Sequence, residues 1–233
     1  MIAHGSAFPV AKLALNNSVP PILMASLRMG LVFLLLIPFW KFKLPNKKFF
    51  KPLILFSISM GVLVYVFMNL SLFHSSIIAP IILGSQLAIP FGILASAFLL
   101  NENISKNKWI LIFTSFLGIV IIFFDPKLTE NYLGLFFASL MALFFGLAQV
   151  YSRQLKELPI SMINASTGIF GFLILIFISI LIEGSFYNNI ENINMNSWIL
   201  IFYQANMAMY HGPANKNQTY LNIQNNLLLD RLL

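Results

Sequence analysis

The sequence predicts an all-α, polytopic membrane protein: a transmembrane helical bundle with about seven or eight spans. Long apolar runs recur through the first 182 residues, and the composition is 59% hydrophobic and only 9% charged. The basic residues between the runs also fall in alternate connections, as in membrane proteins. A soluble protein of this composition would lack the polar residues needed to cover its surface.

Seven apolar runs are the expected spans, and most approach the roughly 20 residues that cross a bilayer core about 30 Å thick. They cover residues 2–15, 22–40, 53–73, 77–100, 109–124, 132–151 and 160–182. An eighth run begins near Trp198, but after Tyr203 it gives way to a segment rich in Asn and Gln. We therefore expect two units of spans, residues 1–125 and 131–203, followed by a polar tail over residues 204–233.

Lysine and arginine residues separate the connections into two sets. The connections after the second, fourth and sixth runs hold nine of them, and those after the odd-numbered runs hold Lys127 alone. The nine are Lys41, Lys43, Lys47, Lys48, Lys51, Lys106, Lys108, Arg153 and Lys156. Because cytoplasmic loops of membrane proteins are enriched in Lys and Arg, the nine and the N-terminus are expected in the cytoplasm. The net charge of +7 therefore reflects orientation in a lipid bilayer, and no nucleic-acid partner is expected.

Enzyme and metal-site motifs are missing from the sequence. It has no HExxH, no phosphate-binding GxxxxGK[ST] and no GxSxG. Its three histidines are scattered, and the absence of cysteine excludes disulfides and thiolate metal sites. We expect no catalytic residues, no metal and no cofactor, and no cleavable signal peptide, because no basic segment precedes the first apolar run.

An internal repeat relates the first run to the sixth. Residues 5–26 and 146–166 share, in the same order, a glycine, a basic residue, a proline and an Ala-Ser pair. The repeat unit then holds five spans, with the second unit incomplete. Because five is odd, two copies must cross the membrane in opposite senses, which is the architecture of many secondary transporters.

Several short motifs point to a family. They are GSAFPVAKLAL near the start, the PP before the second run, Arg28 within it, Pro90 in the fourth run, and LNE before a fifth run that contains Gly118. With these residues the chain resembles the EamA-type transporters of the drug/metabolite transporter superfamily over residues 4–124, and more weakly to about residue 183. The resemblance implies a ten-span inner-membrane permease or exporter of small metabolites. His4 departs from it, because the family usually has Trp there.

A ten-span protein would need two and a half more spans than the sequence provides, and few residues precede Gly5 in the first span. We expect a truncated or frame-shifted coding sequence with an unrelated tail. The alternative is a natural short variant with an amphipathic C-terminal segment. In function, the rival of a transporter is a non-transporting fragment or helper membrane subunit that packs on a full-length partner. A homodimer whose copies complete one another's cavity is a further expectation.

Charged residues within spans are candidate functional residues, because their burial in lipid is costly. Arg28 and Lys12 are the two candidates. Facing a cavity without an intramembrane carboxylate, they would favour a substrate with a carboxylate, such as an amino acid, or a phosphate. Snorkelling or structural pairing is the alternative, and the sequence favours it for Lys12. All seven acidic residues lie at span ends or in loops, which argues against proton exchange at a buried glutamate.

Polar amides and helix-breaking residues complete the predicted site. Gln86, Asn69 and Gln149 are the amides expected nearest the cavity, with interhelical hydrogen bonds as the alternative. Small residues repeat every four positions in the fourth run, at Gly84, Ala88, Gly92 and Ser96. They predict a face that a neighbouring helix approaches closely. Pro80 and Pro90 each remove a helix hydrogen bond, and Pro90 would free the carbonyl of Gln86, so we expect a kink that lines the cavity and gates it.

Overall fold

The computed structural model describes residues 6–39, 45–124, 131–184, 190–191 and 193–209. Every regular element in these ranges is a helix, which confirms the all-α class. In chain order they are α2 (Ala7–Asn16), α3 (Pro21–Leu36), η1 (Ile37–Phe39), α4 (Lys47–Phe56), η2 (Ser57–Val64), α5 (Tyr65–Phe73), α6 (Ile78–Ser85), α7 (Ala88–Leu100), α8 (Lys106–Phe123), α9 (Tyr132–Gln154), α10 (Ile160–Ile182) and α12 (Met195–Met209).

Four helical segments of the described chain are long and apolar enough to cross a membrane, namely Lys47–Phe73, Ile78–Leu100, Tyr132–Gln154 and Ile160–Ile182. The helix Pro21–Leu36 is also apolar but shorter. The seventh expected run, residues 160–182, coincides with α10. The third expected run, residues 53–73, is shorter than the helical segment that contains it, because the lysine-rich residues after Asn46 are already helical in α4. Charged residues at a span's end lower its hydropathy without disturbing backbone hydrogen bonding.

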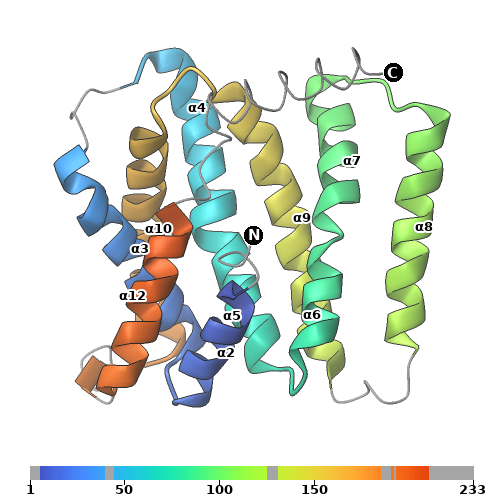
Figure 1. Ribbon diagram of the computed structural model, residues 1–233. Coiled ribbons are helices and arrows are strands. Elements are labelled where there is room, and N and C mark those ends of the chain that lie inside the picture. The colour runs from blue at the N-terminus through green and yellow to red at the C-terminus, as the bar shows by residue number, and fades with distance from the viewer. Residues whose placement is uncertain (1–5, 40–44, 125–130, 185–189, 192, 210–233) are drawn as a thin grey trace, which may run out of the picture.

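The helices lie side by side, and two of the spans are built from pieces stacked end to end (Figure 1). One consists of α4, the π-helical η2 and α5, and the other of α6 and α7. Helix α8 stands at one edge of the bundle, beside α7. It exposes large apolar side chains over much of its length, Phe113 by 69%. Exposed apolar surface of this extent suits contact with lipid better than with water.

The small-residue face of the fourth span packs against α9. A side chain at Gly146 would come within 2.7 Å of the backbone nitrogen of Gly92, and one at Gly84 would meet the Cβ of Ala138 at 3.2 Å. Close approach of two backbones requires small residues on both sides, as the sequence pattern predicted. This face is therefore covered by α9 of the same chain.

The most extensive helix contact joins α3 and α10. Glycines on α10 allow it, because a Cβ at Gly168 would lie 2.9 Å from the backbone nitrogen of Phe33. Gly171 of α10 likewise faces Gly61 of η2, and its Cβ would lie 2.8 Å from that glycine's carbonyl oxygen. Helix α10 therefore holds α3 and η2 together, and these two elements carry residues of the site described below.

Helix α12 corrects one sequence expectation. The apolar pattern weakens after Tyr203, where we expected the eighth span to break, but the helix continues to Met209. Ile201, Gln204 and Ala205 are fully buried on it, against α2 and α3. A buried glutamine lowers hydropathy but does not end a helix when neighbouring helices supply its hydrogen bonds. Residues 210–233 of the expected tail lie outside the described residues, so their origin stays a prediction.

Candidate functional site

A cavity of about 170 Å³ lies between the two predicted units of the chain. A single water needs a cavity of only about 10–15 Å³, so this cavity has room for a small solute. Its walls come from α2, α3, η2, α5, the junction of α6 and α7, and α9. The lining is mostly apolar, and its polar side chains are Arg28, Tyr65, Ser85, Gln86 and Gln149. A few polar groups in an apolar pocket are typical of a binding site for a small molecule.

Arg28 brings a positive charge to this cavity lining, the only one among the residues that the structure describes. It sits in the middle of α3, and only 3% of its surface is exposed. The guanidinium carbon lies 4.1 Å from the ring centroid of Tyr65, in a cation–π contact. One terminal nitrogen, Nη1, donates a hydrogen bond to Oε1 of Gln204 at 3.2 Å. No carboxylate among the described residues pairs with the guanidinium. Its Nε is buried and has no hydrogen-bond acceptor among those residues.

A buried cation without an anion is costly, because an aromatic face and a neutral amide replace only part of its hydration. Such a group is rarely retained for stability alone. In the described part of this chain, Arg28 is therefore the side chain best suited to bind an anionic group that enters the cavity.

Gln86 and Gln149, two of the amides proposed from the sequence, line the same cavity as Arg28. Gln86 lies at the break between α6 and α7, and Gln149 on α9 faces the fourth span near Gly92. We expected Pro90 to leave the Gln86 carbonyl free, but that oxygen accepts a hydrogen bond from the backbone nitrogen of Ile89 at 3.1 Å. The expectation of a free carbonyl was wrong because a tighter turn, bonding three residues apart, replaces the lost helical bond.

Lys12 and Asn69, the other two candidates, make structural contacts outside the cavity lining. The Lys12 Nζ donates hydrogen bonds to the carbonyl oxygens of Leu72 and Ser75, at 2.7 and 2.6 Å. It thereby caps the end of α5, where helical carbonyls lack partners. Asn69 donates through Nδ2 to the carbonyl oxygen of Pro21 at 2.9 Å, in the first turn of α3. Of the gating candidates, Pro80, Gly84, Pro90 and Gly92 are all buried within the fourth span.

A carboxylate holds the start of the helix that carries Arg28. Glu183, just after α10, accepts hydrogen bonds from the backbone nitrogens of Ile22 and Leu23 at 2.7 and 2.8 Å. A negative charge is favourable at a helix N-terminus, where the first backbone N–H groups have no partner within the helix. Ser179 donates a further hydrogen bond to the same carboxylate. The position of α3, and hence the depth of Arg28, is fixed at this end by a contact with α10.

At the other end of the bundle, exposed ion pairs join the first unit to the second. Lys48 contacts Glu157 at 2.9 Å, and Arg153 contacts Glu102 at 3.3 Å. Asn101 has a left-handed conformation, with φ of 53°, which ends α7 and turns the chain toward that second pair. Exposed ion pairs contribute about 0–1 kcal/mol each. Breaking either pair would therefore cost little.

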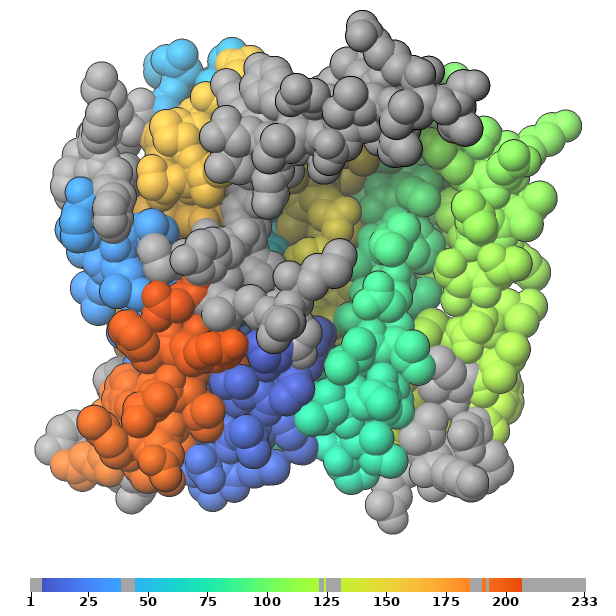
Figure 2. Space-filling view, in the orientation of Figure 1, coloured from blue at the N-terminus to red at the C-terminus, as the bar shows by residue number. Residues whose placement is uncertain are grey.

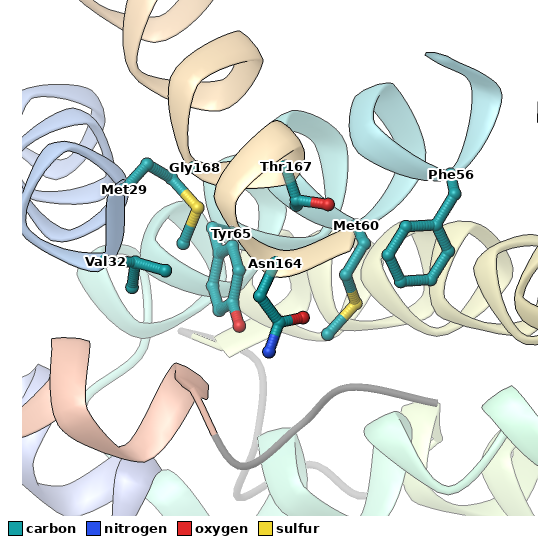
Figure 3. A pocket seen from close by; sticks show the side chains of 8 residues that line it. All are labelled: Met29, Val32, Phe56, Met60, Tyr65, Asn164, Thr167 and Gly168. Atoms are coloured by element: carbon teal, nitrogen blue, oxygen red, sulfur yellow. The ribbon is translucent and has the colours of Figure 1, made fainter. Parts of the chain in front are cut away.

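A second, smaller cavity of about 20 Å³ lies beside the first and shares Met60 and Tyr65 with it. Figure 3 shows the amide of Asn164 and the hydroxyl of Thr167, both from α10, among apolar side chains of α3 and η2. Its size suits one or two waters. Tyr65 and Met60 thus line both cavities.

Sequence reasoning missed Tyr65 and Gln204, the two side chains that contact the Arg28 guanidinium. Gln204 fell within the expected polar tail, and no pattern in the sequence singled out Tyr65. The rule that selected Gln86, a polar amide in an apolar helix, would also have selected Gln204 had the last helix been recognised.

The arrangement so far is a helical bundle with a central, partly polar cavity and one buried cation. A comparison with protein families decides its class, because the sequence model of the EamA-like transporter family matches residues 1–124, more than half of the 233-residue chain. The chain belongs to this family. No curated protein matches the chain.

Membership makes this EamA-like chain a multi-pass membrane protein of a transporter family, and the family consists of transporters and not of enzymes. The matched residues contain every helix from α2 to α8, including Arg28 and Gln86. Gln149 on α9 and Gln204 on α12 lie beyond the match. The cavity therefore combines the family segment with α9, while α12 supplies a hydrogen-bond partner for Arg28 from outside the lining.

Proposed function

We propose that the protein is a secondary transporter that moves small carboxylate-bearing metabolites, such as amino acids, across the inner (plasma) membrane. The observation that supports this substrate class best is the buried guanidinium of Arg28, which lines a solute-sized cavity and has no carboxylate partner among the described residues. An arginine binds a carboxylate through paired, charge-assisted hydrogen bonds. Gln86 and Gln149 would contact the polar remainder of the solute.

The packing of the two units supports alternating access as the mechanism. Helix α3 packs on α10, and α5 packs on α9 in the same way that α12 packs on α2. In the repeat, α2 of the first unit corresponds to α9 of the second, and the span that ends in α5 corresponds to α12. Each of these contacts is therefore the counterpart of another, as expected for two inverted copies related by a pseudo-two-fold axis. Rocking of the units would open the cavity to each side in turn, with the break at Gln86 as the hinge of the fourth span.

Carboxylate binding can be tested on the purified protein in lipid nanodiscs. We expect succinate and L-alanine to raise its melting temperature, and succinamide to leave it unchanged, because a ligand that binds only the folded state stabilises it. Succinamide has the shape of succinate without the charge. Radiolabelled succinate and alanine should also exchange across proteoliposomes that contain the protein. An equal response to succinate and succinamide would contradict a carboxylate site.

Orientation is the second part of the proposal, with the N-terminus in the cytoplasm. The basic residues at the starts of α4 and α8 and at the end of α9 lie at one end of the bundle (Figure 1). We expect a reporter that is active only outside the cytoplasm to be active when fused after Lys127 and silent when fused after Lys48. The reverse pattern of reporter activity would show that the orientation is wrong.

A further inference from the structure

Gln204 joins three helices at the edge of the Arg28 cavity. It is fully buried on α12, and its Oε1 accepts the hydrogen bond from Nη1 of Arg28 on α3. Its Nε2 donates to the carbonyl oxygen of Ala7 on α2 at 3.3 Å. A carbonyl can only accept and a guanidinium can only donate, so these two contacts fix the orientation of the amide. Figure 2 shows α2 and α12 side by side, as this contact requires.

The amide oxygen of Gln204 is a weak partner for a buried cation. It offers a dipole where a carboxylate would offer a full charge, and charge-assisted hydrogen bonds are about twice as strong as neutral ones. Arg28 lines the cavity, whereas Gln204 is not part of the lining. An anion in the cavity can therefore reach the guanidinium and compete with the amide for it.

We propose that Gln204 is a positioning residue whose amide oxygen stands in for the substrate's carboxylate on Arg28 while the site is empty. This inference rests on the proposed function. The amide holds the guanidinium in place without neutralising it, so the charge stays available to the substrate. A carboxylate that takes the Nη1 hydrogen bond releases the amide from α3 and leaves it bound to α2. Substrate binding would then loosen α12 from α3, which couples the occupied site to the packing of the two units.

Gln204→Glu tests this, because it supplies the charge that the substrate would otherwise bring. The new carboxylate loses the donor to Ala7 but gains a charged partner in Arg28. We expect a small change in the melting temperature of the ligand-free protein. In an Arg28→Gln background, the same substitution buries an unpaired carboxylate, and we expect it to lower the melting temperature strongly. An equal loss in both backgrounds would overturn the proposal, because Gln204 would then only fill space.

The succinate response tests the competition directly. We expect Gln204→Glu to raise the succinate concentration needed for stabilisation at least about tenfold, since its own carboxylate occupies Arg28. Gln204→Met, which keeps the side-chain length but removes the amide, should still respond. Gln154→Glu is the matched control, because it makes the same change at an exposed position at the end of α9. It should respond as the parent does.

The outcomes separate this proposal from the proposed function. If the parent protein fails to respond to succinate and alanine, carboxylate transport is wrong. If the parent responds and Gln204→Glu responds at the same concentration, the positioning role alone is wrong. Loss of the response in Gln204→Met would also overturn it, because the amide would then be required for binding and would not be a replaceable stand-in.

Discussion

Replacement of Arg28 by glutamine should reduce the transport of carboxylate solutes by at least about 100-fold while leaving the protein folded in the membrane. The loss corresponds to two hydrogen bonds to a charged group at about 1.5–3 kcal/mol each. Stability should not suffer, because the substitution removes a buried cation that lacks an anionic partner. Arg28→Lys should be intermediate, since it keeps the charge and loses the planar fork. Exchange of labelled succinate in proteoliposomes measures both variants.

Lys12→Met is the matched control for Arg28, because it also removes a cation from a predicted span. Its ammonium binds two backbone carbonyls at the end of α5 and does not line the cavity. We expect this variant to melt at a lower temperature and to bind succinate with unchanged affinity. Full transport by the Arg28→Gln protein would reduce Arg28 to a structural residue and would remove the main support for a carboxylate substrate.

Replacement of Gly168 by alanine should destabilise the protein by about 1–3 kcal/mol, the usual cost of overpacking. The added Cβ would lie 2.9 Å from the backbone nitrogen of Phe33 and 3.1 Å from the carbonyl oxygen of Met29. Backbone atoms cannot rotate away, so α3 and α10 must separate. Because Arg28 lies on α3 next to Met29, we also expect weaker succinate binding. Thermal unfolding in nanodiscs measures the first effect, and the succinate midpoint measures the second.

Gly118→Ala provides the control for this substitution. Gly118 also lies in a helix, α8, but nothing is within 4 Å of a Cβ placed there. The intrinsic gain in helix propensity on replacing glycine by alanine, about 1 kcal/mol, is common to both variants, so their difference isolates the contact with α3. If the two variants melt at the same temperature, the α3–α10 contact is looser than the structure indicates.

Local patterns in the sequence were sufficient to locate the four long apolar helical segments and one helix face that packs closely. Hydropathy identified α10 over its full length, and the four-residue spacing of Gly84 and Gly92 identified the face that packs on α9. The rule that charge is costly in lipid selected Arg28, which the structure places on the cavity. These inferences succeed because the bilayer is a uniform solvent, so length, polarity and residue size already restrict what a helix can do in it.

The contacts of those residues depended on the tertiary structure. Lys12 and Arg28 look alike in the sequence, but one caps α5 and the other lines the cavity. Arg28 and its partner Gln204 are 176 residues apart, and no local pattern links them. The sequence by itself determined that the chain is a membrane helical bundle with a costly cation in its second span. Only the packing of α5 and α12 against α3 decided what that cation touches, because helix contacts depend on the shapes of several surfaces at once.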